Sequence, residues 1–229
     1  ALATGALTAA PAPARADDTI TTQDYFSYYK LDSTRAKGYT GKGVTIAMID
    51  GPVDTSAPEL AGANITVKTP CEYEAAKSTR THATAVASII AYSSPSVDDE
   101  ALGGCKKDNH DLSDTTFATI GMAMNDGAQI ISISRSDPNH KQTPLKWAMA
   151  RAMAQGVIIV GPMGNDARDE NHLSYAWWSG TVGVSAVDST GEFASYSSWG
   201  QGVVAAGVGG PVKVRDYDTG TITETQGTS

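Results

Sequence analysis

The sequence predicts a three-layer α/β fold in which a mostly parallel sheet carries helices on both faces. Short apolar runs alternate along the chain with segments of helical periodicity, the pattern of consecutive βαβ units. The run Val157–Val160 is continuously apolar, as expected for a strand covered on both faces. With 229 residues, of which 41% are hydrophobic and 18% charged, the chain can bury one sizeable core.

Strands are expected where short apolar or β-branched runs are bounded by glycine, proline or aspartate. The first is Val44–Ile49, which follows Gly43 and is followed by Asp50. Later runs of the same kind alternate with helical segments, as parallel neighbours in a sheet require. These further strand candidates are Ile130–Ile133, Val157–Val160, Thr181–Val187 and Val203–Ala206.

Three segments have helical character. Ala83–Ala91 is rich in small residues and can pack closely on a sheet, and Thr115–Ala128 is ended by Gly127. The clearest helix is Pro144–Gln155, because proline suits the first helical turn, where its missing N–H needs no partner. Its apolar residues recur at helical spacing and predict one buried stripe, formed by Leu145, Ala148, Met149, Ala152 and Met153.

The segment Ser93–Asp114 does not follow this pattern. It is polar and has no apolar run, so we predict no strand there. One cluster of carboxylate and amide side chains within it lacks the glycine and the closing glutamate of an EF-hand loop, so we interpret the cluster as part of a solvated loop and predict no metal site. These residues are Asp108, Asn109, Asp111 and Asp114.

Charge and hydropathy exclude two classes of partner. The net charge is −8, from 17 basic and 25 acidic residues, which argues against a broad nucleic-acid surface. No apolar run reaches the roughly 18 residues of a membrane span. A nucleotide site is not expected either, because no glycine-rich loop follows a strand and opens a helix.

The first residues indicate export. Residues 1–16 are rich in alanine, contain no acidic residue and end in Ala14-Arg15-Ala16, like the tail of a secretory signal peptide with its cleavage site. The alternative is a disordered linker rich in alanine and proline. We therefore expect a signal-peptide remnant over 1–16, a single domain over 17–229, and a location outside the cell or in a bacterial cell envelope.

The two cysteines, Cys71 and Cys105, are a disulfide candidate in an exported protein. Such a bridge would close a loop that contains His82. Two free thiols are the alternative, and the spacing fits no zinc motif.

Four residues carry the candidate chemistry. Asp50 directly follows a predicted strand, where a carboxylate can orient and stabilise an imidazole. His82 opens the helical run that follows, and Asn165 ends a turn where its amide can donate to an oxyanion. The last residue, Ser229, completes the chain order Asp, His, Ser, one of the orders in which a catalytic triad is assembled.

Several motifs in this order resemble the subtilisin-like serine peptidases, or subtilases. They are VTIAMIDG around Asp50, HATAVAS at His82, ISISRS, GPMGN ending at Asn165, and QGTS at Ser229. The resemblance covers about residues 25–229 and implies a subtilisin-like fold. It is supported by the order and spacing of the motifs together, since each motif alone would be weak.

The resemblance implies a role for each residue. Asp50 would orient His82, His82 would act as general base and then general acid, and Ser229 would be the nucleophile. Asn165 and the backbone N–H of Ser229 would bind the oxyanion. It also implies a peptide or protein substrate and no organic cofactor; structural calcium is frequent in the family, but no ligand set is identified here. Ser134, Arg135, Ser136, Pro162, Met163 and Gly164 would line the substrate cleft.

The chain departs from the family pattern at several positions. Pro52 follows the acid motif, Ala83 and Ser88 stand where the histidine motif has glycine, and Ser136 replaces a cleft glycine. The family also has a substrate-binding strand within Ser93–Asp114, where we predict none. These departures support an alternative function, a catalytically impaired pseudopeptidase that binds peptides or acts as a scaffold.

The two ends of the chain lead to two further expectations. Few residues separate Ala16 from the start of the domain near Tyr25, which resembles subtilases without a large pro-domain, such as the mycosin type. Nothing follows Ser229, so we expect the C-terminal part of the fold to be missing from this sequence. On that basis the 229-residue chain would be inactive and the complete gene product active.

Overall fold

The computed structural model describes residues 20, 23–68, 77–93, 98–103, 112–135, 143–169, 175–216 and 218–229. The predictions on the signal-peptide remnant, the disulfide, the acidic cluster and one cleft residue concern positions outside these ranges. Those positions are residues 1–16, Cys71, Cys105, Asp108, Asn109, Asp111 and Ser136.

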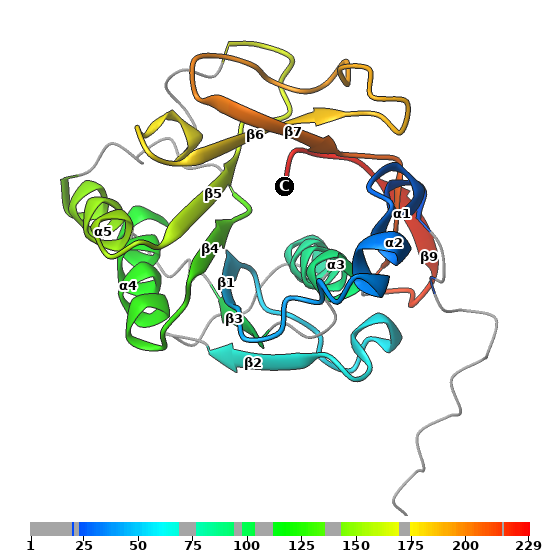
Figure 1. The fold of residues 1–229 in the computed structure, drawn as a ribbon, viewed down its shortest axis with the longest axis horizontal. Coiled ribbons are helices and arrows are strands. Elements are labelled where there is room, and N and C mark those ends of the chain that lie inside the picture. Colours follow the sequence, from blue (N-terminus) through cyan, green and yellow to red (C-terminus); the bar gives the residue numbers. More distant parts are fainter. Residues whose placement is uncertain are drawn as a thin grey trace, which may run out of the picture.

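The centre of the described structure is a seven-stranded sheet in the order β2-β3-β1-β4-β5-β6-β7, and every pairing in it is parallel (Figure 1). The predicted parallel α/β architecture is therefore confirmed. The strands are β1 (Thr45–Asp50), β2 (Asn64–Lys68), β3 (Asp98–Gly103), β4 (Ile130–Ile133), β5 (Ile158–Pro162), β6 (Val182–Val187) and β7 (Val203–Val208).

Helices cover both faces of the sheet. Because successive side chains of a strand point to opposite faces, β1 contributes to two separate clusters. Ile49 packs in one core beneath α4 (Leu112–Asn125) and α5 (Thr143–Ala154), whereas Met48 packs in another beneath α3 (Lys77–Ser93). The short helices of the described chain are α1 (Asp24–Tyr28), α2 (Leu31–Ala36), η1 (Pro58–Leu60) and η2 (Tyr175–Trp177).

The stripe predicted on α5 is confirmed. Leu145, Ala148, Met149 and Ala152 are buried, and Met153 packs against the same core. The helix is followed by Gly156, whose φ of 84° is the left-handed conformation that glycine adopts without strain.

The prediction that Ser93–Asp114 contains no strand is wrong, because β3 lies inside this segment. It pairs along its length with β1, from Thr45 opposite Asp98 to Asp50 opposite Gly103, and on its other side with β2. Backbone pairing on both sides makes this acidic sequence a strand, whereas its composition gives no local signal.

The prediction that Val157–Val160 is covered on both faces is only half right. Ile159 is fully buried in the core beneath α4 and α5, but Ile158 is 50% exposed. Ile158 points to the opposite face of the sheet. In the described part of the chain no helix covers that face at β5 (Figure 1).

A second sheet lies outside the main one. It is the antiparallel hairpin of β8 (Val212–Arg215) and β9 (Ile222–Thr225), which the sequence patterns did not predict. Val212 and Val214 are buried with Tyr25 of α1, against residues of α3. These contacts join α1 to the hairpin, although the two lie near opposite ends of the sequence. The hairpin leads directly into the last residues of the chain.

In the described ranges, no helix is long and apolar enough to cross a bilayer.

Candidate active site

Asp50 is the last residue of β1, at the carboxyl edge of the sheet, and its side chain is 5% exposed. The backbone N–H of Gly51 donates to its Oδ1 at 2.6 Å. Glycine is required at 51, because a Cβ there would lie 2.9 Å from the carbonyl oxygen of Thr79 in α3. The strand end and the first turns of α3 therefore approach closely around the carboxylate.

His82 comes from α3 and meets this carboxylate. Its Nδ1 lies 3.1 Å from Oδ1 and 2.9 Å from Oδ2 of Asp50. The expectation that His82 opens the helix is wrong: α3 begins at Lys77, so the histidine lies more than one turn inside. Two residues that depart from the family motif fit this helix, since Ala83 is fully buried and the Ser88 hydroxyl donates to the Thr84 carbonyl.

The contact with Asp50 changes the acidity of the imidazole. Desolvation lowers the pKa of His82, while the hydrogen bond to Asp50 and the negative charge of that carboxylate raise it. The two effects of Asp50 prevail, and the pKa of His82 is raised above its ordinary value of 6.5. The histidine side chain remains 43% exposed, so a reacting group can reach it.

Ser229 shares a cavity with His82. The cavity has a volume of about 580 Å³, and His82, Asn165 and Ser229 all line its wall. No hydrogen bond joins His82 to Ser229 among the described residues. In structures without a bound substrate such bonds are often long and form only in the complex.

Asn165 is held by the residue before Ser229. Both the backbone N–H and the hydroxyl of Thr228 donate to Asn165 Oδ1, at 2.9 and 3.0 Å, and the Gly164 N–H donates to the Thr228 hydroxyl at 3.1 Å. With Oδ1 engaged, the Nδ2 amide group remains available as a donor. Sequence reasoning missed Thr228, and its place in the motif QGTS was the only signal for it.

The predicted cleft residues follow two adjacent strands. Ser134 follows β4 and continues its pairing, since its N–H donates to the Ile49 carbonyl at 3.3 Å. Pro162 ends β5, and the Met163 N–H donates to the Val184 carbonyl at 2.9 Å.

The glycine after Met163 is fully engaged within the chain. Gly164 gives its N–H to Thr228 and accepts from the Ser198 N–H at 2.9 Å, so neither group is free to pair with a peptide here. Among the described residues, two buried guanidinium nitrogens of Arg135, Nε and Nη2, have no hydrogen-bond partner. The substrate-binding roles of these residues stay predictions.

Structural calcium, which is frequent in the family, would need a set of ligand side chains. No group of three or more His, Cys, Asp or Glu side chains that could hold a metal ion occurs among the described residues.

A sequence model of the subtilase family matches residues 41–229, most of the chain. The chain belongs to the subtilase family. Subtilases are serine endopeptidases, and the family prediction is therefore confirmed.

Curated relatives agree with this assignment. The chain is 26% identical over 196 residues to subtilisin amylosacchariticus of Bacillus subtilis subsp. amylosacchariticus, which covers 80% of the chain and 51% of that relative. It is 27% identical over 196 residues to subtilisin of Bacillus pumilus, covering 80% and 71%. The chain thus spans about half the length of the first of these relatives.

Solved structures show the same fold. The prenylagaramide maturation protease PagA superposes with a TM-score of 0.71 at 23% identity, over 86% of this chain and 74% of that one. The self-cleaved protease domain of PatA gives a TM-score of 0.69 at 26% identity, over 82% and 76%. The structural relatives are consistent with the mycosin-like resemblance.

Proposed function

We propose that the protein is a serine endopeptidase that hydrolyses peptide bonds through Asp50, His82 and Ser229. The observation that carries the proposal is the contact of His82 Nδ1 with the buried Asp50 carboxylate, on the wall of a cavity that Ser229 also lines. The proposal includes export from the cell, which rests on the composition of residues 1–16.

The reaction begins with attack of the Ser229 Oγ on the carbonyl carbon of the substrate, while His82 Nε2 accepts the hydroxyl proton. Asp50 stays ionised; it holds Nδ1–H, fixes the tautomer and stabilises the imidazolium that forms. The carbonyl oxygen becomes an oxyanion, which the Asn165 Nδ2 amide group and the Ser229 N–H stabilise by donating to it.

The tetrahedral intermediate then collapses. The C–N bond breaks, His82 gives its proton to the departing amine, and an acyl group remains bound to Ser229 Oγ. Water attacks this ester with His82 as general base, and the serine is regenerated. The protein is expected to need no organic cofactor for these steps.

Fluorophosphonate labelling tests the proposal. The chain is expressed with any flanking sequence that its gene encodes, treated with a fluorophosphonate and analysed by intact mass. We expect a single adduct on the wild type and none on Ser229→Ala. The exposed Ser195 provides a matched control, because Ser195→Ala should leave the adduct in place.

The absence of an adduct on folded wild-type protein would contradict the proposal. The departures at Pro52 and Ser136 would then favour the alternative function, a peptide-binding pseudopeptidase. Binding of peptides without cleavage, measured by calorimetry and mass spectrometry, would support that alternative.

A further inference from the structure

The nucleophile lies on an element that the main sheet does not hold. Ser229 follows β9, and β8 and β9 pair only with each other in the described sheets. The Gly227 N–H donates to the Gly209 carbonyl at 2.8 Å, which ties the end of the hairpin to the loop after β7. The Thr228 bonds to Asn165 and Gly164 hold the residue before Ser229. The position of Ser229 relative to His82 depends in addition on the contacts that fix the hairpin.

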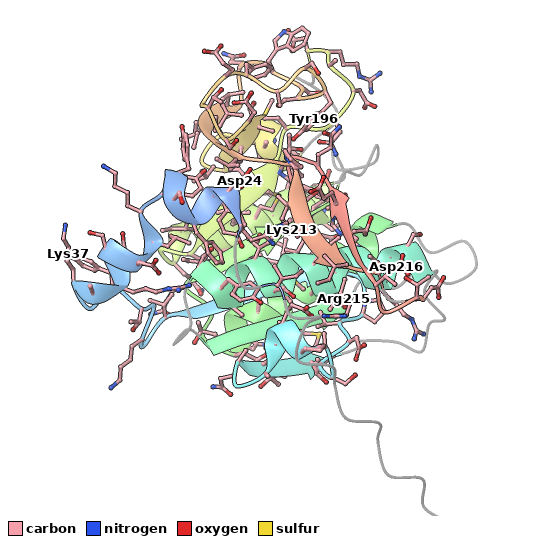
Figure 2. The ribbon with its side chains drawn as sticks, turned by 90° about the vertical axis from the view of Figure 1, so that its right-hand side faces the viewer. Asp24, Lys37, Tyr196, Lys213, Arg215 and Asp216 are labelled. Carbon is pink, nitrogen blue, oxygen red and sulfur yellow. The ribbon has the colours of Figure 1, made fainter. Side chains whose placement is uncertain are left out.

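Gln23 makes the most specific of these contacts. Its side chain is buried, Nε2 donates to the Lys213 carbonyl at 2.7 Å, and Oε1 accepts from the Lys213 N–H at 2.9 Å. One amide thus satisfies both backbone groups of Lys213 on the free edge of β8, as a neighbouring strand would. Figure 2 labels Lys213 on the hairpin, together with Arg215 at the end of the same strand.

Other residues of the same N-terminal segment also hold the hairpin in place. Tyr25 packs against Val212 and Val214, and the Tyr29 hydroxyl accepts from the Val208 N–H at 2.8 Å. Residues 23–29 therefore contact both β8 and the end of β7. The loop after β7 accepts the hydrogen bond from Gly227, two residues before Ser229.

The far end of β8 is held from another side. Arg215 Nη2 lies 2.7 Å from Glu59 Oε1, and its Nε lies 3.0 Å from Oε2. The Glu59 side chain is 1% exposed, so this ion pair is buried. Among the described residues, side chains thus connect the hairpin to the rest of the domain, in addition to the backbone bond from Gly227 to Gly209.

We propose that Gln23 is a positioning residue for the nucleophile. Its amide pairs with the backbone of Lys213 as a neighbouring strand would, and it thereby holds the hairpin in the position that places Ser229 near His82. This inference rests on the proposed function. Gln23 touches neither substrate nor reacting atoms in this role. Misplacement of a reacting group by about 1 Å can lower the rate on the order of 100-fold. The loss of the Gln23 contact should therefore be measurable as a slower reaction at Ser229.

The chain contains a matched control for this residue. Gln129 also binds two backbone groups, since its Oε1 accepts from the Thr45 N–H at 2.6 Å and its Nε2 donates to the Gly43 carbonyl at 3.3 Å. It does so at the start of β1, the opposite end of that strand from Asp50. Gln23→Met and Gln129→Met therefore each remove one accepted and one donated backbone hydrogen bond. Gln23→Met does so at the hairpin that leads to Ser229, and Gln129→Met does so far from the site.

The experiment compares these variants in the protein with its flanking sequence. We expect both variants to lower Tm, but only Gln23→Met to slow fluorophosphonate reaction at Ser229, by about tenfold or more. For a cleaved peptide the loss should appear in kcat, with KM nearly unchanged. Gln23→Glu keeps the acceptor for Lys213 and loses the donor when ionised; it should give a smaller loss and is used if Gln23→Met does not fold.

Equal labelling rates for wild type, Gln23→Met and Gln23→Glu would overturn the inference while leaving the proposed function intact. A loss carried by KM alone, or an equal loss in Gln129→Met, would also overturn it. A wild type that does not react at all would remove the proposed function, and the positioning role with it.

Discussion

The two halves of the candidate site are held by different kinds of structure. Asp50 and His82 come from a strand paired on both sides and from a helix packed on it, so backbone hydrogen bonds and core packing fix them. Ser229 follows a hairpin that pairs only with itself among the described strands. Side chains such as Gln23 and Arg215 hold this hairpin, and hydrogen bonds of Gly227 and Thr228 hold the residues after it. The acid–base pair is therefore the rigid half, and the nucleophile is the half whose position distant side chains can change.

The largest effect should follow from removal of the histidine. We expect His82→Ala to lower kcat by on the order of 10⁶-fold, the loss found in subtilisin when the triad serine or histidine is removed. Peptide hydrolysis measured by mass spectrometry tests this, with Asp54→Asn, an acid on the loop after Asp50, as the control. Activity within tenfold of wild type would show that the rigid half does not take part in the chemistry.

The next effect concerns the buried ion pair of the hairpin. Glu59→Gln leaves the Arg215 charge without its counter-ion and should lower the free energy of unfolding by about 3–5 kcal/mol. The control is Asp32→Asn, because Asp32 is 97% exposed and lies 3.9 Å from Arg35, a pair expected to contribute less than about 1 kcal/mol. Urea denaturation measures both. Similar losses of unfolding free energy in the two variants would show that the hairpin does not depend on the ion pair between Glu59 and Arg215.

A catalytic effect of similar size is expected at Asn165. Asn165→Leu should lower kcat by about 10²–10³-fold with little change in KM, the range found when an oxyanion donor is removed from subtilisin. The steady-state kinetics of a cleaved peptide measure this. A change confined to KM would place Asn165 in ground-state binding instead of oxyanion stabilisation.

The smallest effect is the dependence of stability on pH. Because the pKa of His82 is raised in the folded state, its protonated form stabilises the fold. This contribution is complete below the unfolded pKa, about 6.5, and is lost as pH rises through the higher folded pKa. Asp50→Asn should remove the contribution and lower the histidine pKa, since desolvation remains. NMR titration of the imidazole with matched unfolding curves measures both; an unchanged pKa would contradict the assigned contact.

The sequence predicted β1 and α5 well because their signals are local. Val44–Ile49 is an apolar run that ends at an acid, and the stripe on Pro144–Gln155 repeats at helical spacing; both elements are present close to the expected residues. The strand β3 was missed because its pairing with β1 and β2, and not its own acidic sequence, makes it a strand.

The nucleophile half could not be predicted in the same way. The contact between Gln23 and Lys213 joins residues at opposite ends of the chain, and a polar side chain gives no periodic signal. The same holds for Glu59 and Arg215, whose buried ion pair resembles ordinary surface charge in the sequence. Only the fold shows that these residues meet.

Asp50 and His82 together are proposed to activate Ser229. The most direct measurement is the rate of fluorophosphonate reaction at Ser229 as a function of pH, in wild type and in Asp50→Asn. We predict that the wild-type rate rises with pH through a pKa above 6.5, as His82 becomes the neutral base, and that the variant reacts far more slowly at every pH. Superimposable rate profiles for the two proteins would contradict the claim, because Ser229 would then react without help from the pair.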